Sequence, residues 1–327
     1  MSNSINLPYR KYLKDYFAYS NEMQEAEKSF NRIDCDYISP LIKLTKYSSK
    51  NLKRNFLVIP SIFNSSEILC LAKKENFIEI LLKHGDVYMI NWQQSENNVS
   101  LDDYILEVTK LLVNLTSNCG LIDLVGHCFG GNIAVGIGSM KPNLLLSLTL
   151  LTTPWDYSHF NNAAIWYKLL ALDKIIKNLK FVPKIYLQMM FFLLFPSQFL
   201  KKIDNYYKLE LAEEKQIYMQ VEYWLQSGIN IPVSLYQQFI NQVIGENIFY
   251  NSQWKIEANK INPANITMPV CIISAINDQI APVSSTLALH SLLKNSTLIK
   301  VKGGHISYLI NSDQDFINQY NSWLKQI

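Results

Sequence analysis

The segment 121–135 (LIDLVGHCFGGNIAV) constrains the fold more than any other part of the sequence. Its first half is an apolar, β-prone run, its second half has helical composition, and a glycine-rich turn joins the two. Gly126, Gly130 and Gly131 surround Cys128, which predicts a strand that enters a helix through a turn too tight for larger side chains. The spacing Gly-x-Cys-x-Gly matches a nucleophile elbow, with Cys where most such turns carry Ser.

A turn of this kind has a chemical consequence for its central residue. It lifts the side chain of Cys128 clear of the sheet and places it at a helix N-terminus, where the dipole and free N–H groups favour a thiolate. The N–H of Phe129 is positioned to bind an oxyanion. The alternative is a buried cysteine in an ordinary strand–helix turn. Because the flanking strand and helix both fit the motif, we predict that Cys128 is a nucleophile.

A nucleophile in this setting needs a histidine base and an acid that orients the base, in the chain order acid and then His. Asp278 and His305 each follow a predicted strand, and His305 lies in a loop that also contains glycines. Parallel strands end at one edge of a sheet, so we predict a triad of Cys128, His305 and Asp278. Asp156, which follows an earlier predicted strand, is the alternative acid.

The remaining polar positions of the site follow from the same topology. A second oxyanion donor is expected from the loop after the first core strand, where Ile62 is the candidate and Ser61 the alternative. His127 is predicted to point away from the nucleophile and to line the pocket. The other histidines are predicted to be structural or surface residues: His84, His159 and His290.

Short β-rich runs alternate with helical segments along the chain, which favours βαβ units and a mostly parallel sheet. The predicted strands are 56–59, 87–91, 121–125, 145–151, 269–274 and 297–301, with 43–47 as an edge strand. The predicted helices are 65–83, 101–115 (with a capping box of Ser100 and Asp103), 130–140, 283–293 and 312–324. The predicted organisation is a leader (1–50), an α/β core (51–154 and 266–327) and a helical cap insertion (155–265) without a clear strand.

Composition excludes several other classes of protein. The 327 residues carry a net charge of only +3 and show no basic stripe for nucleic acid. Five widely spaced cysteines without a CxxC motif argue against a disulfide framework or a zinc site, and favour a reducing, cytoplasmic compartment. The polar N-terminus lacks the apolar core of a signal peptide. The most apolar run, 185–195, is about half of a membrane span and is predicted to be a buried or surface-lying helix.

Several blocks of the sequence together resemble the polyhydroxyalkanoate synthases. GHCFGG is similar to the lipase-like box of that family, G-x-C-x-G-G, which carries Cys in the nucleophile position. Four further blocks follow the family's order: VIPSIFNSSEIL (58–69), GDVYMINW (85–92), TTPWDY (152–157) and GGHISYLIN (303–311). The short leader is similar to the smaller class of catalytic subunits, which act with a second, non-catalytic subunit. Asn91 and Gln93 depart from the Asp and Gly that usually flank the family's tryptophan.

This resemblance implies an α/β-hydrolase fold and an acyltransferase that polymerises 3-hydroxyacyl-CoA thioesters through a covalent acyl group on Cys128, releasing coenzyme A. It implies no metal and no cofactor beyond coenzyme A as the leaving group. The implied partners are the growing polyester, a second copy of the chain or a non-catalytic subunit, and the surface of a polymer granule in the cytoplasm. Two alternatives stay open: a thioesterase or esterase on the same scaffold, and an inactive granule-associated homologue.

Overall fold

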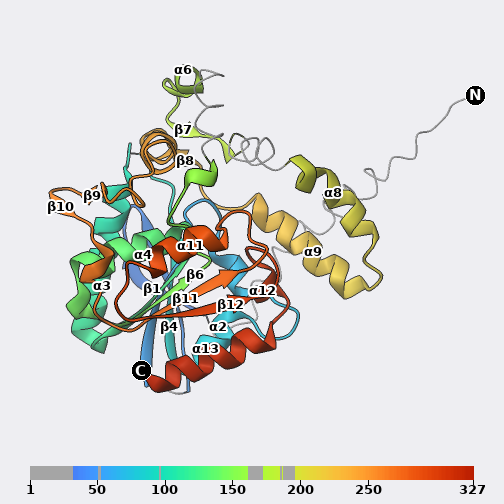
Figure 1. Ribbon diagram of the computed structural model, residues 1–327, viewed down its shortest axis with the longest axis horizontal. Helices are drawn as coiled ribbons and strands as arrows, with labels where there is room; N and C mark the ends of the chain where they lie inside the picture. Colours follow the sequence, from blue (N-terminus) through green and yellow to red (C-terminus); the bar gives the residue numbers. More distant parts are fainter. Residues whose placement is uncertain (1–31, 51–52, 96, 161–171, 185, 187–195) are drawn as a thin grey trace, which may run out of the picture.

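The computed structural model describes residues 32–50, 53–95, 97–160, 172–184, 186 and 196–327. Its centre is an eight-stranded sheet with helices on both faces (Figure 1). The strand order is β1-β2-β4-β3-β5-β6-β11-β12. The β1–β2 and β2–β4 ladders are antiparallel and the others are parallel. The predicted α/β fold with a mostly parallel central sheet is therefore confirmed.

The strands of this sheet are β1 (Arg32–Ile38), β2 (Ile42–Tyr47), β3 (Arg54–Ile59), β4 (Gly85–Trp92), β5 (Ile122–His127), β6 (Leu145–Leu151), β11 (Val270–Ala275) and β12 (Ser296–Val301). The helices around it are η1 (Ser66–Cys70), α2 (Phe77–Leu82), α3 (Leu101–Cys119), α4 (Phe129–Met140), η2 (Pro142–Leu144), α11 (Val283–His290), α12 (Ser307–Ile310) and α13 (Gln314–Gln326). The described elements between β6 and β11 are η3 (Ser158–Phe160), α6 (Leu172–Ile176), β7 (Phe181–Val182), α8 (Pro196–Tyr207), α9 (Ala212–Leu225), β8 (Ile231–Pro232), α10 (Val233–Gln238), the π-helix η4 (Phe239–Gly245), β9 (Lys255–Ile256), β10 (Asn259–Lys260) and η5 (Pro263–Asn265).

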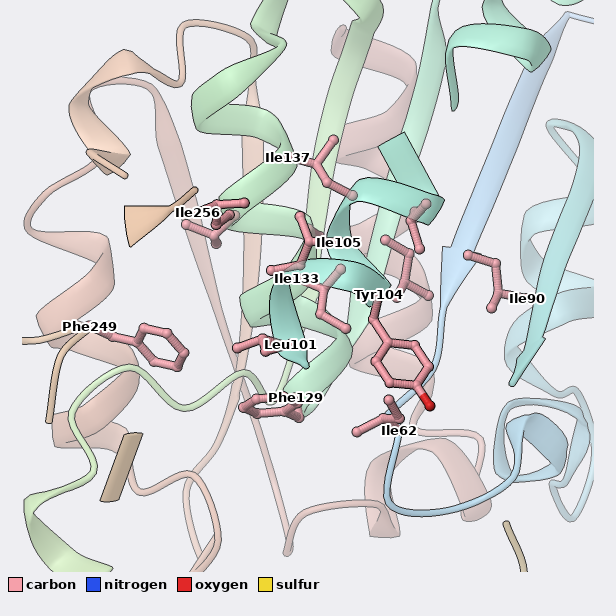
Figure 2. Packing of buried hydrophobic residues seen from close by; sticks show 14 of the residues in the cluster. Ile62, Ile90, Leu101, Tyr104, Ile105, Phe129, Ile133, Ile137, Phe249 and Ile256 are labelled. Atoms are coloured by element: carbon pink, nitrogen blue, oxygen red, sulfur yellow. The ribbon is translucent and has the colours of Figure 1, made fainter. Parts of the chain in front are cut away.

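The pleat of the strands creates an apolar layer on each face of the sheet, because successive side chains point to opposite sides. On β3, Phe56 joins the cluster formed with α2 and α13, whereas Leu57 joins the cluster formed with α3 and α4. Figure 2 shows part of the cluster formed with α3 and α4, with Ile105 of α3 beside Ile133 and Ile137 of α4. These two layers hold the strands in place, and the strand ends can therefore carry a site.

Three expectations about individual elements are wrong. The helix expected over 65–83 is two helices, because Asn76 starts a new one with its own capping box, closed by Glu79. Residues 43–47 lie in β2, which is an inner strand because β1 pairs along its outer side. The region between β6 and β11 contains the short ladders β7–β8 and β9–β10. By contrast, α3 begins at the predicted capping box of Ser100 and Asp103.

The described part of the β6–β11 region is mainly helical, and α8 and α9 extend to one side of the sheet (Figure 1). The helix α9 is fastened to the loop after β3, since the Trp224 indole donates to the Ser65 carbonyl at 2.8 Å. The apolar run 185–195 lies outside the described residues except for Tyr186. Within the described ranges, no helix combines the length and the apolarity that crossing a membrane requires.

Candidate active site

Cys128 occupies a left-handed turn between β5 and α4. Its φ is 53° and its ψ is −124°, a conformation that non-glycine residues adopt rarely and at a cost. Two hydrogen bonds hold this backbone: the Cys128 N–H donates to the Leu151 carbonyl at 2.9 Å, and the Cys128 carbonyl accepts from the Gly131 N–H at 2.9 Å. The thiol is half-buried. The strand–turn–helix geometry expected of an elbow is therefore present.

The glycines of the elbow allow close backbone approaches. A Cβ on Gly126 would overlap the backbone of Gly131, so the strand and the helix could not come this near with a larger residue. A Cβ on Gly130 would overlap the Ile59 carbonyl, and Gly131 itself lies against the Thr153 side chain. The start of α4 is thus packed directly on the ends of β3 and β6.

His305 and Asp278 form a buried pair. The His305 Nδ1 and the Asp278 Oδ2 are 2.7 Å apart, and the Asp278 side chain is fully enclosed. The other carboxylate oxygen accepts from the N–H groups of Ile280 and Ala281 at 2.8 and 2.9 Å. Burial alone would raise the pKa of Asp278, but His305 and these N–H donors lower it below its ordinary value. The carboxylate therefore stays ionised and fixes one edge of the imidazole.

The third member of the arrangement is Cys128, which lies close enough to His305 to affect the charge of its imidazole. Burial opposes a charge on His305, but the Cys128 and Asp278 side chains outweigh it and raise the pKa of the imidazole to about 10. The structure thus brings together the three residues that the sequence nominated. They follow β5, β11 and β12, which end at one edge of the sheet with β6 among them.

Asp156, the alternative acid, has another role in the structure. Its Oδ1 accepts from the Ser158 N–H at 2.9 Å and from the Asn247 side-chain amide at 2.8 Å. These bonds close a turn after β6 and tie it to the segment after η4. Of the two candidate acids, Asp278 is the one paired with His305.

The loop expected to supply the second oxyanion donor packs beside the elbow. The Phe63 and Phe129 rings are 5.3 Å apart, and the Trp92 indole holds the loop by donating to the Pro60 carbonyl at 3.2 Å. Figure 2 shows Ile62 and Phe129 at the same end of the apolar cluster. The Ser61 hydroxyl, by contrast, accepts from the Phe63 N–H at 3.4 Å within the loop.

His127 lies closer to the triad than its position in the turn suggested. Its ring is buried, and its centroid is 5.7 Å from that of His305. Burial and the neighbouring His305 charge lower the pKa of His127 to about 3, so this ring is neutral. Its Nε2 has no hydrogen-bond partner among the described residues. The other histidines hydrogen-bond to Asn321, to the Ile280 carbonyl and to Ser296, respectively: His84, His159 and His290.

The sequence reasoning missed two residues next to the site. Thr152 has a φ of 43°, and its hydroxyl donates to the His305 carbonyl at 3.2 Å. The Tyr157 hydroxyl donates to Asn132 of α4 at 2.9 Å, which holds the segment after β6 against the elbow helix. The resemblance of the TTPWDY block was the only signal that pointed to this segment.

Asn91 lies where the polyhydroxyalkanoate synthases usually have Asp, and its side-chain amide both donates and accepts a hydrogen bond. It donates to the Thr45 hydroxyl of β2 at 2.9 Å and accepts from the Ser66 hydroxyl of η1 at 2.8 Å. These two bonds join β2 to η1 through the Asn91 side chain. In the part of the chain that the structure describes, no group of His, Cys, Asp and Glu side chains is arranged to hold a metal ion.

Comparisons with known proteins agree with this geometry. The profile of the alpha/beta hydrolase fold family matches residues 90–312. The chain is 23% identical to the poly(3-hydroxyalkanoate) polymerase subunit PhaC of Thiocystis violacea, over 84% of this chain and 81% of that protein. It is also 23% identical to the subunit of the same name from Allochromatium vinosum, over 83% of this chain and 80% of that protein.

Among solved structures, the monoacylglycerol lipase of Paleococcus ferrophilus superposes with a TM-score of 0.55 at 15% identity. The superposition covers 86% of this chain and 98% of the lipase, and at this identity it shows the shared fold alone. Together, the comparisons confirm the expected resemblance to the polyhydroxyalkanoate synthases and the expected fold.

Proposed function

This chain belongs to the alpha/beta hydrolase fold family, and on that premise we propose that it is an acyltransferase that polymerises 3-hydroxyacyl-CoA thioesters into polyhydroxyalkanoate. The observation that carries the proposal is the strained turn of Cys128 at the same sheet edge as the hydrogen-bonded His305–Asp278 pair. The names of the relatives, which are polyhydroxyalkanoate polymerase subunits, support the substrate class.

The first half of the reaction loads the acyl group. The Cys128 thiolate attacks the carbonyl carbon of the substrate thioester and forms a new C–S bond. The bond to the coenzyme A sulfur breaks, and the departing thiolate takes the proton held by His305. The N–H groups of Phe129 and Ile62 stabilise the oxyanion that forms on the way. One thioester replaces another, so the step is close to balanced in free energy.

The second half extends the polymer. The 3-hydroxyl group of another acyl unit gives its proton to His305 while its oxygen attacks the acyl carbonyl on Cys128. An ester bond forms, the bond to the Cys128 sulfur breaks, and the thiolate returns beside a protonated His305. Asp278 keeps the imidazole oriented and stabilises its positive charge through both halves. Coenzyme A is a leaving group here, and the mechanism uses no further cofactor.

The second candidate is a thioesterase or esterase, in which water replaces the 3-hydroxyl group as the acceptor. It is favoured by the same triad, because the Cys–His–Asp arrangement does not by itself choose between the two acceptors. A cysteine nucleophile suits exchange between thioesters better than simple ester hydrolysis, and this favours the polymerase. A third reading, an inactive granule-associated homologue, is disfavoured by the presence of Cys128, His305 and Asp278 at one edge of the sheet.

The wider setting is part of the proposal. We expect the region 155–265 to form a cap over the site of the α/β core (51–154 and 266–327), with 1–50 as a leader. We expect the chain to act in the cytoplasm at the surface of polymer granules, as a homodimer or with a non-catalytic synthase subunit. The lack of a membrane-crossing helix among the described residues is compatible with this location.

The test is incubation of the protein, alone and with a non-catalytic subunit, with 3-hydroxybutyryl-CoA. Both released thiol and insoluble polymer are followed. We expect both products to appear, and both to be lost in Cys128→Ala. The control is Cys119→Ala, since that half-buried thiol ends α3 and hydrogen-bonds to Tyr88, outside the triad. Soluble 3-hydroxybutyrate in place of polymer would identify a thioesterase. Undiminished thiol release from Cys128→Ala would contradict both the polymerase and the thioesterase assignment.

A further inference from the structure

The corner Leu151–Thr153, at the end of β6, has an unusual backbone. Thr152 is fully buried and has a φ of 43°. A β-branched residue rarely adopts a left-handed conformation, because its branched side chain crowds the backbone there. Such residues persist only where the surrounding structure fixes them, and they gather at functional sites.

Three hydrogen bonds connect the corner to Cys128, to the strand before Asp278 and to His305. The Leu151 carbonyl accepts from the Cys128 N–H at 2.9 Å. The Thr152 N–H donates to the Ile273 carbonyl at 2.9 Å, on the strand that leads to Asp278. The Thr152 hydroxyl donates to the His305 carbonyl at 3.2 Å. One corner thus links the nucleophile, the strand of the acid and the loop of the base.

The left-handed turn makes this set of bonds possible. A regular continuation of β6 would keep residue 152 in the extended conformation of the strand. The turn instead ends the strand at Leu151. Thr152 then bonds to β11 through its N–H and to the His305 loop through its hydroxyl. The side-chain bond is the only one of the three that a substitution can remove while the backbone bonds stay.

We propose that Thr152 is a positioning residue whose hydroxyl sets the approach of the His305 ring to Cys128. The inference rests on the roles of Cys128 and His305 in the proposed function, but not on the identity of the substrate. Without the hydroxyl, the His305 carbonyl loses this bond and the loop that carries the ring can shift. If the ring lies farther from Cys128, the imidazolium stabilises the Cys128 thiolate less.

The neighbouring Thr153 offers a matched control. It is also fully buried, but its hydroxyl has no hydrogen-bond partner among the described residues. Thr153→Val therefore removes no hydrogen bond, whereas Thr152→Val makes the same change of shape and removes the bond to the His305 carbonyl. Thr152→Ser keeps the hydroxyl without the methyl group and serves as the rescue variant.

The experiment measures how fast iodoacetamide alkylates Cys128 between pH 5 and pH 9, with the site read by peptide mass spectrometry and folding checked by thermal melting. We expect Thr152→Val to move the midpoint of the rate profile upward by about one pH unit, which is about tenfold slower alkylation below the midpoint. Thr152→Ser and Thr153→Val should keep the wild-type profile. If Thr152→Val does not fold, Thr152→Ala provides the same comparison.

Two results would overturn the proposal: a wild-type profile in Thr152→Val or Thr152→Ala, or an equal shift in Thr152→Ser. Because alkylation needs no acyl substrate, these outcomes are independent of polymer formation. A wild-type protein that alkylates normally but does not release coenzyme A would count against the proposed function and leave the role of Thr152 intact.

Discussion

His305 should carry a positive charge in the folded protein at neutral pH, with Cys128 as the main cause. Burial of the ring opposes the charge, whereas Cys128 and then Asp278 favour it strongly enough to raise the pKa of His305 to about 10. Compared with an ordinary histidine pKa of about 6.5, this favours the imidazolium by about 5 kcal/mol. His305 would then already carry its proton before substrate arrives.

Cys128→Ala tests this directly because it removes the largest favourable contribution and leaves the ring buried. Loss of one adjacent opposite charge lowers the pKa of a histidine by about 1 to 3. The pKa of His305 should therefore fall, and its titration should move toward neutral pH. Asp278→Asn should also lower the pKa of His305, because the 2.7 Å contact to a carboxylate is replaced by a contact to a neutral amide.

The measurement is an NMR titration of the chain with isotope-labelled histidine, from pH 5 to pH 10. Only 5 histidines are present, so individual rings can be assigned with single substitutions. In the wild type, His305 should stay protonated well above neutral pH. His127, whose pKa is lowered to about 3, should stay neutral throughout. Because His305 is charged and the neighbouring His127 is neutral, the two rings give the experiment an internal reference.

Cys119→Ala is the control, since it also removes a thiol but leaves the triad unchanged. A His305 signal that titrates near pH 6.5 in the wild type would refute the reasoning. So would an unchanged titration in Cys128→Ala, because Cys128 would then not be the charge that holds the proton.

Two further predictions concern the scaffold. Arg54→Met should destabilise the fold by about 3–5 kcal/mol in urea unfolding, because Arg54 makes two 2.8 Å bonds to the buried Asp123 carboxylate. The double variant Arg54→Met with Asp123→Asn should recover most of this loss. Strictly additive effects of the two substitutions would contradict the pairing. Gly130→Ala should lower the melting temperature and slow Cys128 alkylation, since its methyl group would overlap the Ile59 carbonyl. Gly138→Ala in the same helix has ordinary contact distances of 3.5 Å or more and should be neutral or stabilising, so equal effects of the two would count against the close-approach argument.

The parts of the site that the sequence predicted are those set by local geometry or by simple topology. The elbow around Cys128 is local, because a strand can turn directly into a helix only where small residues let the backbones meet. Asp278 and His305 were predictable because each follows a strand of a parallel sheet, and such strands end at one edge. The start of α3 was predictable for a similar reason, since the Ser100 capping box involves residues three positions apart.

The parts that escaped prediction depend on contacts between distant segments. Thr152 matters because its hydroxyl reaches a carbonyl in the His305 loop, 153 positions along the chain, and residue type alone does not reveal that contact. The same holds for His127, whose neighbour is the His305 ring. Asn76 is different, because its capping box with Glu79 is a local signal that the continuous apolar spacing of 65–83 obscured.

Two strained residues lie at neighbouring strand ends of the site. Cys128 and Thr152 both have a positive φ, and the Cys128 N–H bonds to the residue just before Thr152. Glycine at position 152 would adopt this conformation without strain, whereas a non-glycine residue costs about 1–3 kcal/mol there. What threonine adds is the hydroxyl on the His305 carbonyl and a side chain that fills a buried space. A change that relaxes this corner therefore moves the nucleophile and its base together, and stability gained there is expected to come at the expense of their alignment.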